Sequence, residues 1–142
     1  MSGTEWADRQ APSLDEFEEL AVAALESLPQ PFRDLVRGVR CYVAEFAEAD
    51  VLDELDIESE FDLMGLFTGI GLAQEGITQT GRMPNVVYLY RRPILDYWAE
   101  HEETLGAVVT HVLIHEMGHH FGFSDEDMEA LEEQAAREQL TK

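Results

Sequence analysis

The chain has 142 residues, which suffices for one domain with a single hydrophobic core. Hydrophobic residues make up 45% of it, a share that predicts a packed globule and excludes a disordered chain. With 30 acidic and 9 basic residues the net charge is -21, which repels a phosphate backbone and excludes nucleic acid as the expected partner. The acidic surface either keeps the protein soluble or favours basic substrates.

The sequence predicts no disulfide and no membrane segment. Cys41 is the only cysteine, so no disulfide can form within the chain. Residues 1–12 are polar and carry no apolar signal stretch, and no run approaches the roughly 20 apolar residues that span a bilayer. We therefore expect a cytoplasmic protein with no membrane partner, built as a flexible tail over residues 1–12 and a single domain over 13–142.

The first predicted helix follows the tail. Ser13 with Glu16 three residues later is a capping-box signature. Apolar residues then recur at helical spacing, namely Leu14, Phe17, Leu20, Ala24 and Leu28. Pro29 and Pro31 end this helix.

A short helical turn, a strand and an acidic connection are expected next. Residues 32–36 predict the turn, which Gly38 closes, and the β-branched and aromatic run 39–46 predicts a strand. Residues 41–81 contain 10 acidic side chains and no Lys or Arg, which indicates a solvated connection. Its glycines do not match nucleotide-binding spacing and are interpreted as turn residues: Gly65, Gly69 and Gly71.

The second half predicts a strand and three helices. Residues 85–90 are the clearest strand, and the prolines that flank it, Pro84 and Pro93, favour an edge position. A helical pattern begins at about Ile94, a longer helix is expected over 102–121, and a charged final helix over 125–140. The buried face of the longer helix is predicted to be Leu105, Val108, Val109, Val112 and Leu113. Together these elements predict an α+β fold, in which a small mixed sheet of 39–46 and 85–90 packs on the 102–121 helix.

The chemistry is concentrated in the sequence His-Glu-Met-Gly-His at residues 115–119. On a helix, His115 and His119 lie one turn apart on the same face, so both imidazoles can bind one ion. A catalytic zinc ion needs three protein ligands and a water. Glu116 is rotated by about 100° from His115, beside the metal, where its carboxylate can accept a proton from that water.

Two further residues extend this motif. Gly122 can adopt the left-handed conformation that ends a helix, and the resulting turn would bring Asp125 round to supply an oxygen. We therefore predict a Zn²⁺ site of His115, His119 and Asp125. Three histidines stacked along one helix span too far for one tetrahedral ion, so His111 is interpreted as a supporting or structural residue. His120 points away from the ligand face and is interpreted as a packing or surface residue.

The form His-Glu-x-x-His-x-x-Gly-x-x-Asp resembles the metzincin side of the zincin metallopeptidases. The chain is more closely similar to a family of small bacterial zincin-like proteins, through Leu89-Tyr90-Arg91-Arg92-Pro93 and through Ile114 to Gly122. The similarity covers about residues 17–131. It implies a minimal zincin-like fold, with the ligands His115, His119 and Asp125 and with Glu116 as base. It also implies that the strand 85–90 borders the cleft and can pair with an extended peptide.

The favoured function is that of a zinc-dependent metallopeptidase that hydrolyses peptide bonds with a metal-activated water and Glu116 as general base. Its substrate would be a peptide or a protein, and a basic one if the acidic surface takes part. The alternative is a non-catalytic zinc-binding scaffold that acts as a protein-interaction module. Two features motivate this alternative. One is the acidic surface. The other is that only 17 residues follow Asp125, too few for the C-terminal subdomain that completes the substrate pocket of the larger metzincins.

Overall fold

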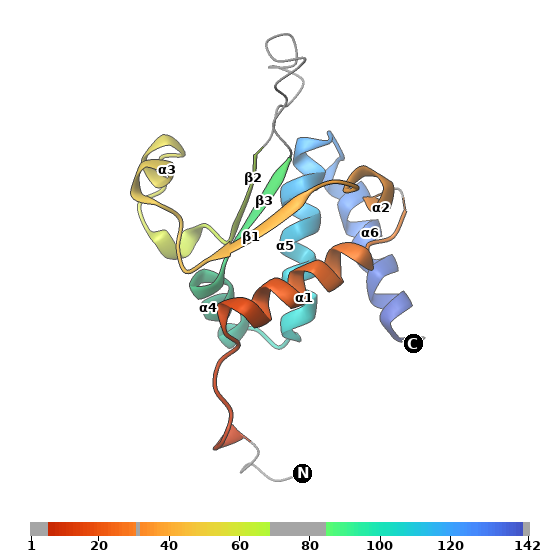
Figure 1. Cartoon of the computed structure of the whole chain (residues 1–142). Helices are drawn as coiled ribbons and strands as arrows, with labels where there is room; N and C mark the ends of the chain where they lie inside the picture. The colour runs from red at the N-terminus through yellow and green to blue at the C-terminus, as the bar shows by residue number, and fades with distance from the viewer. Residues whose placement is uncertain (1–5, 31, 69–84, 141–142) are drawn as a thin grey trace.

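A three-stranded mixed sheet and a long helix packed against it organise the chain (Figure 1). The structure is a computed structural model that describes residues 6–30, 32–68 and 85–140. Its elements in chain order are α1 (Leu14–Glu26), α2 (Phe32–Leu35), β1 (Arg40–Ala44), α3 (Ala49–Glu54), the 3₁₀ helix η2 (Glu60–Asp62), β2 (Gly65–Thr68), β3 (Val86–Tyr90), α4 (Arg91–Glu100), α5 (Leu105–His120) and α6 (Asp125–Leu140). This arrangement confirms the predicted α+β class.

The strand order is β1-β3-β2, with β1 parallel and β2 antiparallel to β3. Tyr88 at the middle of β3 lies opposite Tyr42 on one side and Leu66 on the other. The predicted edge position of 85–90 is therefore wrong, and so is its predicted pairing with a peptide, because both of its edges are occupied. Pro93 falls beyond the strand, in α4, so it removes no hydrogen-bond donor from the ladder.

The strand β2 was not predicted, because it is short and lies within the acidic connection. Gly65 begins this strand and is buried, so its interpretation as a turn residue is wrong. A Cβ atom on Gly65 would lie 2.8 Å from Val112 Cγ1 and 3.1 Å from the Tyr88 carbonyl oxygen. The missing side chain thus lets β2 pass directly over α5. Gly69 and Gly71 lie outside the described residues.

The first and last predicted helices are confirmed. Ser13 caps α1: its hydroxyl accepts from the Glu16 backbone N–H at 3.1 Å, and its own N–H donates to the Glu16 carboxylate at 2.8 Å. The final helix begins at Asp125, as predicted, and α2 is followed by Gly38 at φ +86°.

The two middle helices differ from the prediction at their first residues. Helix α4 begins at Arg91 rather than near Ile94, because Pro93 lies in its first turn, where no intrahelical N–H bond is lost. Helix α5 begins at Leu105 rather than at 102. The hydroxyl of Thr104 fixes this start by accepting from the Ala107 N–H at 3.1 Å.

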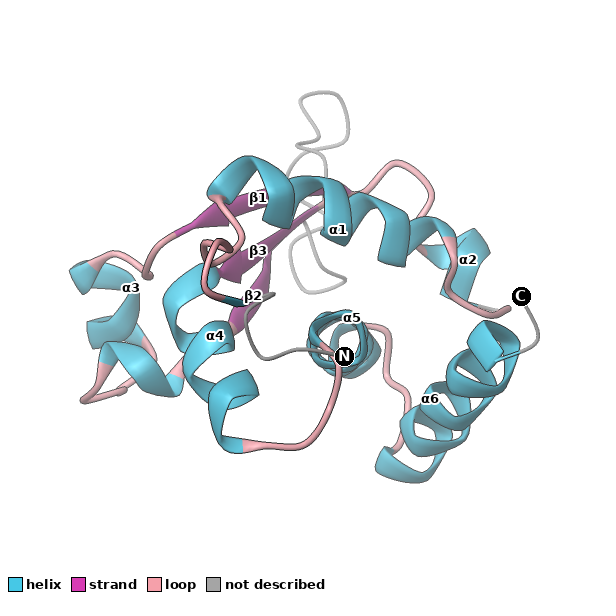
Figure 2. Ribbon diagram, turned by 90° about the horizontal axis from the view of Figure 1, so that it is seen from below, coloured by secondary structure: helices cyan, strands magenta, loops and turns pink. Residues whose placement is uncertain are grey.

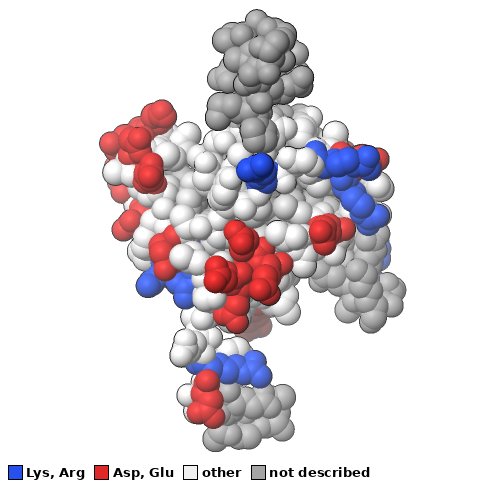
Figure 3. Space-filling view, viewed as in Figure 1, with Lys and Arg blue, Asp and Glu red and all other residues white. Residues whose placement is uncertain are grey.

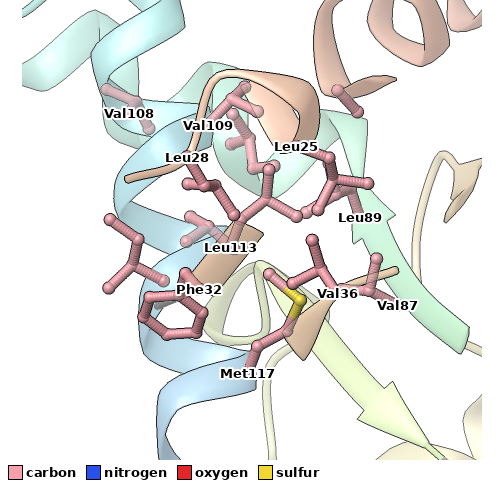
Figure 4. Close-up of a cluster of buried hydrophobic side chains, with 14 of the residues drawn as sticks. Leu25, Leu28, Phe32, Val36, Val87, Leu89, Val108, Val109, Leu113 and Met117 are labelled. Atoms are coloured by element: carbon pink, nitrogen blue, oxygen red, sulfur yellow. The ribbon is translucent and has the colours of Figure 1, made fainter. Parts of the chain in front are cut away.

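Helix α5 lies at the centre of the molecule, between the sheet and α1 on one side and α6 on the other (Figure 2). Its predicted buried face is confirmed except for Leu105, which is half-buried. The side chains that pack on it come from α1, α2, the residues just after these two helices, and β3 (Figure 4), and include Leu25, Leu28, Phe32, Val36, Val87 and Leu89. No helix within the described residues is long and apolar enough to cross a membrane.

The Leu-Tyr-Arg-Arg-Pro segment has a structural role at the junction of β3 and α4. Arg91 donates to the Glu45 carboxylate at 2.9 Å and to the Pro12 carbonyl oxygen at 2.5 Å, and Arg92 reaches the same carboxylate at 3.3 Å. These arginines, Arg91 foremost through its hydrogen bond, hold the pKa of Glu45 below its usual value. The segment thus ties β1 and the residues before α1 to the end of the central strand.

Helices α5 and α6 pack tightly at Gly118, within the His-Glu-x-x-His motif. A Cβ atom there would overlap Met128 Sδ and lie 2.8 Å from Met128 Cγ, and Met128 is fully buried. Glycine at position 118 therefore sets how closely α6 approaches the helix that carries the histidines.

We expect Gly118→Ala to destabilise the fold by about 1–2 kcal/mol. Overpacking against Met128 costs about 1–3 kcal/mol, and the better helix propensity of alanine offsets roughly 0.5–1 kcal/mol of it. Gly106→Ala is the matched control, because a Cβ atom at Gly106 meets nothing within 4 Å, and it should be neutral or slightly stabilising. Denaturant unfolding of the metal-free proteins measures both effects. An equal increase in the free energy of unfolding in both variants would show that Met128 moves aside without an energetic cost.

Candidate metal centre

Three histidines stand one turn apart along α5, on the face that the sequence predicts. The ring centroids of His111 and His115 are 4.2 Å apart, and those of His115 and His119 are 6.2 Å apart. The first two rings are half-buried, whereas His119 is exposed near the end of the helix. The residues of the motif are thus presented from one rigid element.

Glu132 of α6 faces two of these histidines. Its Oε1 lies 2.6 Å from His111 Nδ1, and its Oε2 lies 2.8 Å from His115 Nε2. Each ring nitrogen donates its proton to the carboxylate, which can only accept. The ligand atoms of these three side chains lie within 4.8 Å of one another, so the group could hold a metal ion.

The predicted ligands are distributed differently. His115 belongs to the group with His111 and Glu132, whereas His119 and Asp125 do not, among the residues that the structure describes. Gly122 has φ +84°, so the predicted left-handed turn is present, and Asp125 follows it as the exposed first residue of α6. The ligand set His115, His119 and Asp125 therefore stays a prediction.

Glu132 was missed by the sequence reasoning, although a signal for it exists. Over residues 125–137, the part of α6 whose burial is described, the buried positions are Met128, Leu131 and Ala135, which follow helical spacing. Glu132 comes four residues after Met128, so it borders the face that contacts α5. A carboxylate at the edge of a buried stripe opposite a row of histidines is the pattern that would have identified it.

Glu116 lies on α5 between the histidine row and β2. Its Cγ is 3.4 Å from the position that a Cβ atom of Gly65 would take, so β2 partly covers it. Burial raises the pKa of Glu116 above its usual 4.5, and the nearby charge of His119 opposes this rise. A half-buried carboxylate of raised pKa beside a histidine is suited to accept and return a proton.

Comparison with known proteins supports the interpretation of this site. The profile of the zincin-like metallopeptidase family matches residues 36–135, which contain the whole sheet, α4, α5 and most of α6. The chain belongs to this family. No curated protein matches the sequence. Membership of a zincin-like family implies zinc, and the nitrogen and oxygen donors along α5 and α6 are ligands that zinc accepts.

The remaining notable side chains of this zincin-like domain have structural roles. His120 is exposed and its ring packs on Phe67 at 4.3 Å, in agreement with its interpretation as a packing or surface residue. Burial, with a smaller effect from the charge of Glu18, raises the pKa of Cys41 to about 11. Its thiol therefore stays protonated at neutral pH and is not a nucleophile, although it lines a cavity of about 400 Å³ between α1, α2 and β1.

We expect Glu116→Gln to be more stable than the unchanged protein at pH 7 to 8 when a chelator removes metal. The raised pKa means that burial disfavours the carboxylate, so the charged form costs stability above that pKa. The cost fades as pH falls through the raised pKa towards 4.5, and the two stabilities should converge there. Thermal unfolding at several pH values measures the difference.

Glu133→Gln is the control for this measurement, because it removes an exposed charge from the same acidic molecule. At neutral pH, Glu116→Gln should increase the stability of the protein more than Glu133→Gln does. Identical pH profiles for the two variants would contradict the burial of the Glu116 charge.

Proposed function

We propose that the chain is a zinc-dependent metallopeptidase in which Glu116 acts as the general base. The observation that carries this proposal is the half-buried Glu116 carboxylate of raised pKa, one residue after His115 on the central helix of a zincin-like fold. A raised pKa shifts this carboxylate in the direction that a general base needs at physiological pH. The family membership agrees with this reaction class.

In this proposal His115, His119 and Asp125 hold the ion. When bound, Zn²⁺ lowers the pKa of a water towards about 7 and polarises the carbonyl of the scissile bond. Glu116 accepts the proton of the attacking water and delivers it to the leaving amine. The cover that β2 provides through Gly65 excludes solvent from one side of this carboxylate, which strengthens its interactions.

The start of α6 leaves the carboxylate of Asp125 available for this role. The cap of α6 is made by Ser124 and Asp127: the Ser124 hydroxyl accepts from the Asp127 N–H at 3.0 Å, and the Asp127 carboxylate accepts from the Ser124 N–H at 3.2 Å. Asp127 is thus engaged in capping, whereas Asp125 is exposed at the turn that Gly122 forms. This difference favours Asp125 over Asp127 as a third ligand.

The acidic surface supports a basic peptide or protein as substrate. On the face seen in Figure 3, acidic side chains gather over α1 and α3, and a group of basic ones lies beside α2. With β3 paired on both sides, β2 is an edge strand whose Gly65 borders Glu116, so we expect an extended peptide to pair with β2. Electrostatic attraction between the acidic surface and a basic substrate would raise the association rate most at low salt.

One observation favours the alternative, a zinc-binding scaffold that binds a protein partner without turnover. His115 Nε2 lies against Glu132 rather than towards the exposed His119. An enzyme needs His115 and His119 on one ion, whereas a binding module does not.

Glu116→Gln separates the two functions. For a peptidase, the substitution should keep zinc content and fold but lower peptide cleavage by about 10²- to 10⁴-fold, because the proton acceptor is lost. Cleavage of a mixed peptide library that includes basic sequences, measured at full zinc occupancy, provides the test. Glu133→Gln should cleave like the unchanged protein.

Unchanged cleavage by the Glu116→Gln protein at full zinc occupancy would remove this residue from the mechanism. A wild-type protein that binds zinc and a protein partner but cleaves nothing would favour the binding module.

A further inference from the structure

We propose that His111, His115 and Glu132 form a second Zn²⁺ site, which competes with the His115–His119–Asp125 site because both need His115. The site joins α5 to α6 and lies one turn nearer the start of α5 than the predicted peptidase centre. Its existence does not depend on peptidase activity. Only its effect on catalysis rests on the proposed function.

Side-chain adjustments would let this group admit an ion. In a tetrahedral site with metal–ligand bonds of about 2.0–2.1 Å, neighbouring donor atoms lie about 3.3 Å apart. The two pairs of donor atoms now lie at 2.6 Å and 2.8 Å, His111 Nδ1 to Glu132 Oε1 and His115 Nε2 to Glu132 Oε2. Each pair would have to separate by roughly 0.5–0.7 Å, and the three donor atoms, which lie within 4.8 Å of one another, would all have to come to this separation. The ion would enter between them as the two ring nitrogens release their protons.

The donor set suits zinc rather than calcium or magnesium. Two imidazoles and one carboxylate form a ligand set of open zinc sites, whereas hard cations prefer oxygen ligands alone. The carboxylate is the most buried of the three side chains, at 26% exposure against 36% and 35% for His111 and His115. A charged carboxylate in that position gains from a cation beside it.

A fourth ligand also has room. A cavity of about 160 Å³ opens between α5 and α6 next to His111 and Glu132. Its remaining walls are mostly small residues, including Ala107, Ala135 and Ala136. A water in this cavity could complete four-coordination.

Competition follows from the chemistry of His115. A neutral imidazole has one nitrogen lone pair, so His115 can serve one ion at a time. The chain should therefore bind one zinc ion in either of two positions. Loss of His119 would remove one position, and loss of Glu132 the other.

Zinc stoichiometry and affinity of purified full-length variants test this inference. Zinc is measured by elemental analysis after gel filtration and by titration against a chromophoric chelator. We expect His119→Ala to keep one zinc per chain, because His111, His115 and Glu132 are intact. The double variant His119→Ala/Glu132→Gln should bind zinc more than about 100-fold more weakly, since it loses a direct ligand and not only a supporting partner. His115→Ala should lose both positions.

His119→Ala/Glu133→Gln is the matched control, because Glu133 is the exposed neighbour of Glu132 on the same helix, and it should bind zinc like His119→Ala. His119→Ala/His111→Ala gives a second test if the Glu132 variant does not fold. Circular dichroism of the metal-free proteins establishes folding. A zinc-free His119→Ala protein, or a Glu132→Gln double variant that binds like its parent, would overturn the proposal.

The effect on catalysis has a sign that separates a competing site from a supporting role. If Glu132 draws zinc away from the peptidase centre, Glu132→Gln should raise cleavage at one zinc per chain. If Glu132 only orients His115, the same change should lower cleavage by about 10- to 100-fold. A protein that cleaves nothing yet shows the zinc pattern above would contradict the peptidase and leave the second site standing.

Discussion

The approach of α6 to α5 at Gly118 is the constraint on which the rest of the site depends. Met128 fills the space that any side chain at position 118 would need, and it is fully buried there. Glu132, one turn further along α6, reaches two histidines of α5 as a result. Within the His-Glu-x-x-His motif, packing therefore requires glycine at position 118, whereas metal binding and proton transfer require the histidines and Glu116.

The fold was predictable where local signals are strong. The capping box at Ser13, the glycines with positive φ at 38 and 122, and the helical period after Asp125 all identified real boundaries. The sheet was less accessible. The strand β2 has four residues and lies in an acidic segment, and the order of strands depends on tertiary pairing, which no single segment encodes.

The site was predictable in its elements but not in its partners. The spacing of His115, Glu116 and His119 follows from helix geometry alone, and the histidine rings do line one face of α5. The role of Glu132 depends on how two helices cross. The sequence alone shows only that this carboxylate lies beside the apolar stripe of α6, not which residues of α5 it meets. Likewise, the interpretation of His111 as a supporting residue rests on α5 alone, whereas Glu132 of α6 places His111 in a group that could hold a metal ion.

The embedding of α5 separates folding from chemistry within one helix. Its buried positions run through Val108, Val109, Val112, Leu113, Ile114 and Met117, so most of its circumference belongs to the core. His111, His115 and His119 form a row along one side of the helix and are exposed or half-buried. None of these three side chains belongs to the hydrophobic core, so the helix is a scaffold on which ligand sets for other transition metals can be engineered while the protein keeps its fold.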